Sequence, residues 1–110
     1  MKDQEKEEIY QEFKDRVNMT PSELEDWLDK DESKSVGADS GDGEAVGHKS
    51  GKKIIDIKNT KKAELTDDQY KHMQKVVGYV NRHLAQKPKS KVEDSKWRYS
   101  LMNWGHDPLK

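Results

Sequence analysis

Apolar residues recur at helical spacing in two long stretches of the chain. In residues 3–18 they form one stripe, at Ile9, Tyr10, Phe13 and Val17. After residue 65 they step by three or four positions, at Tyr70, Met73, Val77, Val80 and Leu84. Residues three or four apart lie on one face of an α-helix, so both stretches are predicted to be amphipathic helices. The second helix should end before Pro88, which cannot continue it.

Two predicted helices begin at a capping box. Thr20 and Glu23 have the T-x-x-E spacing, and Pro21 between them suits a first helical turn. Thr66 and Gln69 repeat the arrangement. Each box is flanked by an apolar pair placed as a hydrophobic staple, Met19 with Leu24 and Leu65 with Tyr70. Helix starts are therefore predicted at residues 20 and 66.

Residues 33–51 have almost nothing to bury, being rich in Gly, Ser, Asp and Lys, and they predict a mobile loop. A helix is expected to begin near Ser50 and to carry three Ile residues between 54 and 57. The last helix places Trp97, Leu101 and Trp104 on one face, with Gly105 at its end.

No segment alternates with the period of two that a strand requires. We expect an all-α fold of four to five helices in one small domain with a long Gly-rich loop. An acidic N-terminal helix would occupy residues 1–18, and residues 19–110 would form a single all-α domain that includes the mobile loop 33–51.

Composition narrows the class of protein. Of the 110 residues, 30% are hydrophobic and 39% are charged, and 21 Lys and Arg nearly balance 22 Asp and Glu. The absence of Cys excludes disulfides, thiolate zinc sites, iron–sulfur clusters and a Cys nucleophile. No apolar run is long enough for a membrane span, and the charged start is unlike a signal peptide. We therefore expect no membrane partner and an intracellular location, cytoplasmic or, in a eukaryote, nuclear.

The two halves of the chain carry opposite charge. Residues 1–47 contain 6 basic and 15 acidic residues, whereas residues 48–110 contain 15 basic and 7 acidic residues. Such asymmetry predicts either an anionic partner for the basic half or pairing of the two halves within one molecule.

Basic residues of the second half are candidates for contact with nucleic-acid phosphates. At 100° per residue, Lys71, Lys75, Gly78 and Arg82 share the solvated face of their helix. Exposed N–H groups and Lys side chains at the expected helix start near Ser50 would also attract an anion. We expect Gly78 to permit close packing of a neighbouring helix or, as an alternative, close approach of a nucleic-acid backbone. The full candidate set is Lys49, Ser50, Lys52, Lys53, Lys58, Lys61, Lys62, Lys71, Lys75, Arg82 and Arg98.

Motifs for other chemistry are incomplete. A Walker A loop would need Gly at Val46 and Ser or Thr at Lys53, so nucleotide hydrolysis is not supported. The acids of residues 39–44 miss the spacing of a calcium loop, and no His pair has metal-ligand spacing. We expect no cofactor, no metal and no catalytic residue. An enzyme would need His48, His83 or His106 in a pocket with acidic partners.

Several separated blocks resemble a known family. They are PSELEDWL at residues 21–28, SVG at 35–37, GHKSG at 47–51, KVVGYV at 75–80, RHLAQ at 82–86 and WRYSLMNWGHDP at 97–108. Together they are similar to a family of small uncharacterised proteins of bacteria and fungi, often labelled only "DNA-binding protein". The resemblance covers most of residues 20–108 and leaves out the acidic stretch before residue 18. It implies DNA binding and supplies no catalytic or base-reading residues.

The combined prediction is a protein that binds nucleic acid, chiefly duplex DNA, through backbone phosphates and largely without sequence preference. No helix rich in Asn, Gln and Arg is present to read bases. The alternative is a protein-interaction module or homo-oligomer in which the oppositely charged halves meet between chains.

Overall fold

The computed structural model describes residues 2–36 and 46–110, and within them it contains helices and no strand. The α-helices are α1 (Asp3–Arg16), α2 (Pro21–Leu28), α3 (Asp31–Lys34), α4 (Val46–Lys58), α5 (Asp67–Leu84) and α6 (Lys96–Asn103). Two 3₁₀ turns, η1 (Lys62–Glu64) and η2 (Val92–Asp94), precede α5 and α6. The predicted all-α class is confirmed. The additional helix is α3, a single turn too short to show a repeating apolar pattern.

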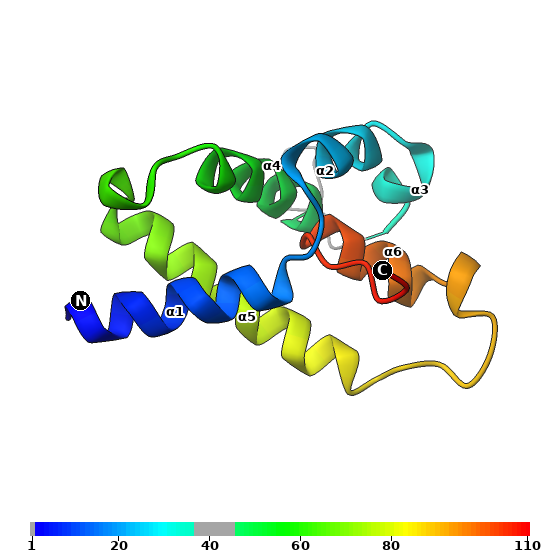
Figure 1. Cartoon of the computed structure of the whole chain (residues 1–110). Helices are drawn as coiled ribbons and strands as arrows, with labels where there is room; N and C mark the ends of the chain where they lie inside the picture. Colours follow the sequence, from blue (N-terminus) through cyan, green and yellow to red (C-terminus); the bar gives the residue numbers. More distant parts are fainter. Residues whose placement is uncertain (1, 37–45) are drawn as a thin grey trace.

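The helices surround one hydrophobic core. In Figure 1, α1 lies along α5, while α2, α4 and α6 pack together on the other side of the molecule. The most deeply buried side chains come from every long element and the segment after α1, and they include Val17, Leu24, Ile54, Met73 and Leu101. Phe13 and Val17 belong to this core, so the acidic helix packs against the same apolar centre as residues 19–110.

Both predicted capping boxes are present. The Thr20 hydroxyl accepts from the Glu23 N–H at 3.1 Å, and the Glu23 carboxylate accepts from the Thr20 N–H at 2.9 Å. Thr66 and Gln69 make the same reciprocal pair at the start of α5. The helix starts expected from sequence at these two positions are confirmed.

Residues 46–51 of the predicted loop are helical, because α4 begins at Val46 rather than near Ser50. Gly51 is buried in this helix, where an added Cβ would lie 2.8 Å from the Asn103 carbonyl oxygen and from a Leu28 methyl group. The predicted mobile loop 33–51 is therefore wrong for residues 46–51: Gly51 serves helix packing, not chain mobility. Residues 33 and 34 belong to α3, and residues 37–45 of that loop lie outside the described residues.

Candidate nucleic-acid interface

One of the predicted phosphate-contacting lysines, Lys53, lines a groove between α4 and α5, and the charge of a second, Lys75, acts on His72 in the same groove. The groove has a volume of about 180 Å³ and is lined by Lys53, Asp56 and Ile57 of α4 and by Asp68, Gln69 and His72 of α5. Lys75 stands one turn after Lys71 on α5, and both are exposed. Neither Lys53 nor Lys75 has an ion pair within the described residues.

His72 lies between these lysines and is held neutral. Burial lowers the pKa of its imidazole to about 4, and the positive charges of Lys53 and Lys75 act in the same direction. The ring is hydrogen bonded to the Ser50 hydroxyl at 3.0 Å and stacks with Trp104, with 6.2 Å between ring centroids. The positive charge of the groove therefore comes from the lysines, with Asp56 and Asp68 close by.

The predicted solvated face of α5 is confirmed for its charged residues. Lys71, Lys75 and Arg82 are exposed. The expectation that Gly78 permits close packing of a neighbouring helix is wrong, because no atom of another helix lies within 4 Å of an added Cβ. An added Cβ at Gly78 would meet only the Arg82 guanidinium, 3.2 Å from Nη1.

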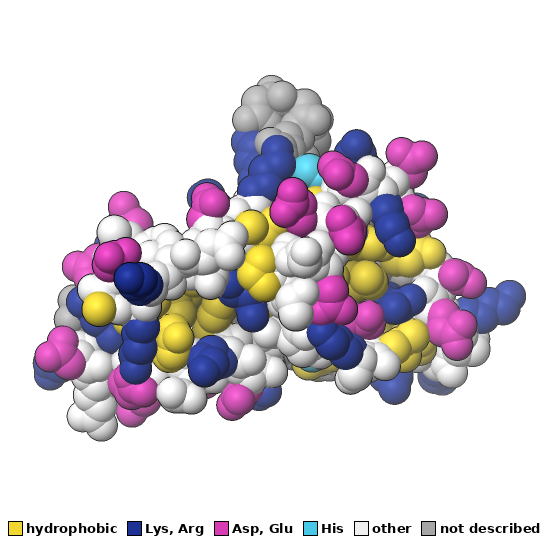
Figure 2. Space-filling view, turned by 45° about the horizontal axis from the view of Figure 1, so that its top comes forward, with side chains coloured by type: hydrophobic (Ala, Val, Ile, Leu, Met, Phe, Trp, Pro, Cys, Tyr) yellow, Lys and Arg dark blue, Asp and Glu magenta, His cyan; other side chains and the backbone are white. Residues whose placement is uncertain are grey.

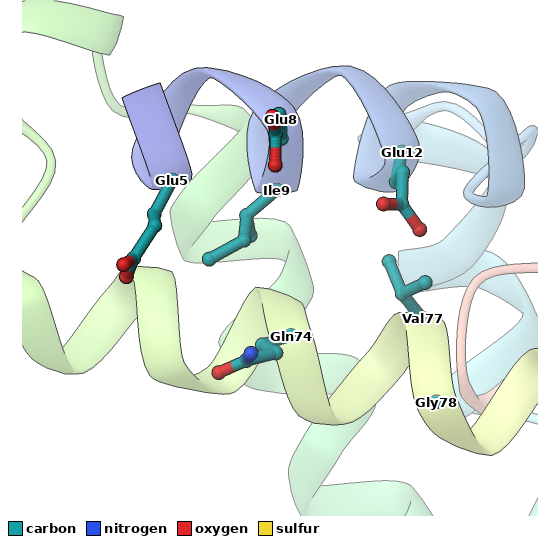
Figure 3. Close-up of a pocket in the computed structure, with 7 residues that line it drawn as sticks. All are labelled: Glu5, Glu8, Ile9, Glu12, Gln74, Val77 and Gly78. Carbon is teal, nitrogen blue, oxygen red and sulfur yellow. The ribbon is translucent and has the colours of Figure 1, made fainter. Parts of the chain in front are cut away.

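An acidic groove borders the same helix. It has a volume of about 330 Å³ between α1 and α5, and Figure 3 shows Glu5, Ile9 and Glu12 directed from α1 toward α5. Val77 and Gly78 form the α5 side. A phosphate beside Gly78 would approach the carboxylates of α1 and be repelled by them, so this flank of α5 is unfavourable for an anion.

Ser50 is not available to a ligand. Its side chain is buried, with 2% of the residue exposed, and its hydroxyl bonds to His72 inside the protein. The helix begins four residues before it, so Ser50 does not cap the helix. The predicted role of Ser50 in phosphate contact is wrong, because serine here fills a tight helix–helix contact. Lys49 is half-buried, whereas Lys52 is exposed.

Arg98 is held in an internal clamp, contrary to its predicted role at the surface. Its Nε and Nη2 donate to the two carboxylate oxygens of Asp107 at 3.2 and 3.1 Å, and Nη1 donates to the Glu93 carbonyl at 2.9 Å. Burial would raise the pKa of Asp107, but these hydrogen bonds hold it below its usual value. Most of the hydrogen-bonding capacity of Arg98 is therefore used within the fold.

The remaining candidates lie apart from the α4–α5 groove. Lys62 forms an ion pair with Glu7, and Lys61 is exposed beside it in the connection before α5. Lys58 is half-buried on another flank of α4, near Lys14 and Lys110. The predicted set is therefore not one continuous surface: Lys53 lines the groove, Lys75 acts with it on His72, and these three lie elsewhere.

A stack of five rings links α5 to α6 and was missed by sequence reasoning. Trp104 stacks with His72 and, at 4.2 Å between centroids, with Tyr79. Tyr79 stacks with His83 at 5.2 Å, and His83 stacks with Trp97 at 6.1 Å. The expected core position of Trp104 is confirmed by its 4% exposure, while Trp97 is half-buried. The only sequence signal was the shared flank of the two histidines on α5.

The three histidines considered for an enzyme each bond to a backbone carbonyl. His48 Nε2 lies 2.7 Å from the Leu28 oxygen, His83 Nε2 lies 3.2 Å from the Trp97 oxygen, and His106 Nδ1 lies 2.6 Å from the Arg16 oxygen. Each bond joins two segments distant in sequence. The rings lie at three separate places in the fold and form no common site.

The oppositely charged halves are paired within the molecule. Ion pairs join Lys6 to Asp67, Lys62 to Glu7 and Lys110 to Glu23. Figure 2 shows basic and acidic side chains interspersed over one face of the molecule. The pairs of Lys62 with Glu7 and of Lys110 with Glu23 neutralise part of the sequence asymmetry, where η1 meets α1 and the C-terminus meets α2. The pair of Lys6 with Asp67 has the opposite sense and does not reduce it.

Comparison with known proteins identifies a family whose function is unknown. A family model described as "Protein of unknown function (DUF3140)" matches residues 12–102. The match begins inside α1, earlier than the resemblance seen in the sequence blocks, and ends within α6. No curated protein and no solved structure matches the chain. Among the described residues, no helix has the length and apolarity needed to cross a membrane.

Proposed function

This chain belongs to the DUF3140 family of unknown function, and we propose that it binds nucleic acid through backbone phosphates at the α4–α5 groove. The observation that carries the proposal is a pair of exposed lysines on two adjacent helices, Lys53 in the groove and Lys75 on α5, whose charges both act on the neutral His72. Both ammonium groups lack an ion pair within residues 2–36 and 46–110. Two adjacent phosphates of a nucleic-acid strand would supply the missing counter-charge.

The contact is electrostatic and does not read sequence. Lys presents a compact charge to phosphate oxygens, and neither lysine has a side-chain amide partner that would fix it for base recognition. Lys71 and Arg82 extend the charge along α5, while Asp56, Asp68 and the acids of α1 limit its width. We therefore expect weak, salt-sensitive binding, chiefly to duplex DNA, that involves few phosphates.

Fluorescence polarisation with a random 20-bp duplex tests the proposal. We expect log K to fall linearly with log salt, with a slope corresponding to about two to four phosphates. Lys53→Gln with Lys75→Gln should weaken binding by about tenfold or more at low salt and reduce the slope by about 2.

A matched control removes the same charge elsewhere. Lys30 and Lys34 are exposed on the α2–α3 side, and Lys30→Gln with Lys34→Gln should weaken binding much less. Equal losses in the two double variants would show a general charge effect and would refute the groove as the site. Absence of binding at the lowest salt would refute the function itself.

The alternative of a protein-interaction module or homo-oligomer has its own measurement. Ion pairs between the halves already form inside one molecule, so pairing between chains would have to replace them. A molecular-mass measurement at low and high salt distinguishes the two. A dimer that dissociates at high salt favours this alternative, and a monomer at both salts favours the nucleic-acid proposal.

A further inference from the structure

A second basic cavity also borders α4, and it shares Ile57 with the α4–α5 groove. It is formed where α1, the start of α2 and the end of α4 meet, and its volume is about 200 Å³. Phe13, Pro21 and Ile57 give it an apolar wall, and the Tyr10 ring forms part of its edge. Two ammonium side chains, Lys14 and Lys58, also line it. Apolar walls with a few convergent polar groups are the usual lining of a small-molecule site.

Neither lysine of this cavity forms an ion pair among the described residues, although Glu7 acts on Lys14 electrostatically. Among the described residues Lys58 has no hydrogen bond or ion pair of its side chain, although it is half-buried. Lys14 likewise has no ion pair there and lies over the Tyr10 ring, 5.6 Å from its centroid. Lys110 is nearby, but its ammonium is bonded to Glu23 and to the Asn18 carbonyl.

The electrostatic state of Lys58 agrees with this arrangement. Burial lowers the pKa of its ammonium, and the positive charges of Lys110 and Lys14 lower it further. An anion in the cavity would lie against both unpaired ammonium groups and would relieve their mutual repulsion. The Thr60 hydroxyl already donates to the Asp56 carbonyl at 2.6 Å, so the two lysines are the donors that an anion would meet.

We propose that this cavity binds a small organic carboxylate, with its charged group between Lys14 and Lys58 and its apolar body against Phe13 and Ile57. The size of the cavity sets the size of the ligand, because drug-sized ligands occupy about 300 Å³ or more. The mostly apolar wall favours a carboxylate with an aliphatic or aromatic body over inorganic phosphate, which has no apolar surface to bury. The cavity borders the nucleic-acid groove at Ile57, but its two lysines differ from those of the groove, and the proposal does not depend on nucleic-acid binding.

Nuclear magnetic resonance titration of the full chain with sodium benzoate tests the proposal at constant ionic strength. We expect the amide signals of Phe13 and Lys58, which line this cavity and not the α4–α5 groove, to shift with a Kd on the order of 1 mM, as suits a ligand of so few atoms. Benzamide has nearly the same shape without the charge, and it should bind at least about tenfold more weakly. Inorganic phosphate should leave these signals unchanged at the same concentration.

Substitution of single lysines tests which of them bind the carboxylate group. Lys14 is exposed, so Lys14→Gln keeps the fold and should weaken benzoate binding by about fivefold or more. Lys58→Gln should have a larger effect, and Lys53→Gln, in the α4–α5 groove, should have none. The pKa of the Lys58 ammonium, followed through its side-chain signals, should rise when benzoate binds.

Three results would overturn the proposal. Equal affinity for benzoate and benzamide would show that the lysines do not hold the charge. Phosphate binding as strong as benzoate binding would show that the apolar wall is not used. Benzoate binding that survives Lys14→Gln and Lys58→Gln would place the ligand elsewhere. None of these results bears on DNA affinity, which depends on Lys53 and Lys75.

Discussion

Two residues predicted to contact phosphate have their polar groups occupied within the fold. Ser50 and Arg98 have the side chains expected of a phosphate site, yet one is buried against His72 and the other is clamped to Asp107. A buried hydroxyl or guanidinium must find a partner, and here both find one within the fold. Residue type alone therefore predicted more phosphate-contacting residues than the fold leaves available. Exposure and existing partners decided which cations remain available.

Gly51 provides a test at the scale of one residue. Gly51→Ala would place a methyl carbon 2.8 Å from the Asn103 backbone oxygen, which cannot move without shifting α6. We expect the free energy of unfolding to fall by about 1–3 kcal/mol, because the strain of overpacking exceeds the gain in helix propensity. Chemical denaturation checks this. An unchanged or higher unfolding midpoint would mean that α4 and α6 are not in such close contact.

At the scale of elements, spacing and capping signals defined the helices well. The stripe from Tyr70 to Leu84 and the box at Thr66 place α5 within a residue or so of its observed bounds. The start of α4 was misplaced because residues 46–51 carry few apolar side chains and two glycines. Tertiary packing against α2 and α6 makes that turn helical despite its weak intrinsic preference.

Gly78 gives the matching prediction for an element. An added Cβ there meets only the end of the flexible Arg82 side chain. We therefore expect Gly78→Ala to raise the free energy of unfolding by about 0.5–1 kcal/mol, as alanine restricts the unfolded chain and favours the helix. Denaturation of the two alanine variants side by side measures opposite signs at Gly51 and Gly78.

The same variant also separates two explanations for the glycine. If a nucleic-acid backbone approaches Gly78 closely, Gly78→Ala will weaken DNA binding while it stabilises the fold. If phosphates contact only the flank of α5 that faces α4, DNA affinity will stay unchanged. The acidic groove beside Gly78 leads us to expect the second result.

At the scale of the whole molecule, hydrogen bonds join segments near the two ends of the chain. Asn18 donates to the Asp107 carbonyl at 3.0 Å, and its own side-chain oxygen accepts from the Asp107 N–H at 2.8 Å. The ring stack from His72 to Trp97 joins α5 to α6. Burial lowers the pKa values of the two imidazoles in this stack, His72 and His83, so the free energy of unfolding should depend on pH.

His72 sets the expected pH dependence. Its pKa is about 4 in the folded protein, against 6.5 for the free side chain. As pH falls below 6.5 the unfolded chain takes up the proton first, so the free energy of unfolding should decrease between about pH 6.5 and pH 4. Burial is the main cause of the low pKa of His72, and the charges of Lys53 and Lys75 lower it further.

Thermal unfolding of the protein and of His72→Gln across pH 4–7.5 measures this effect. The melting temperature of the unaltered protein should fall more steeply below pH 6.5 than that of the variant. The slope is the informative quantity, because the variant also changes the bond to Ser50 and hence the absolute stability. Parallel slopes would show that His72 does not titrate between the two states.

The sequence by itself determined the all-α class, the helix starts at the capping boxes and the apolar faces, because these follow from local spacing and local hydrogen bonds. It also marked the cations that could meet an anion. Only the tertiary structure decided which of them act on one group, since Lys53 and Lys75, which both act on His72, are 22 positions apart. It also added a cation that the sequence did not mark, Lys14, which lines a cavity with Lys58, 44 positions away. Distance in space and burial of side chains arise from packing between helices, which no local pattern encodes.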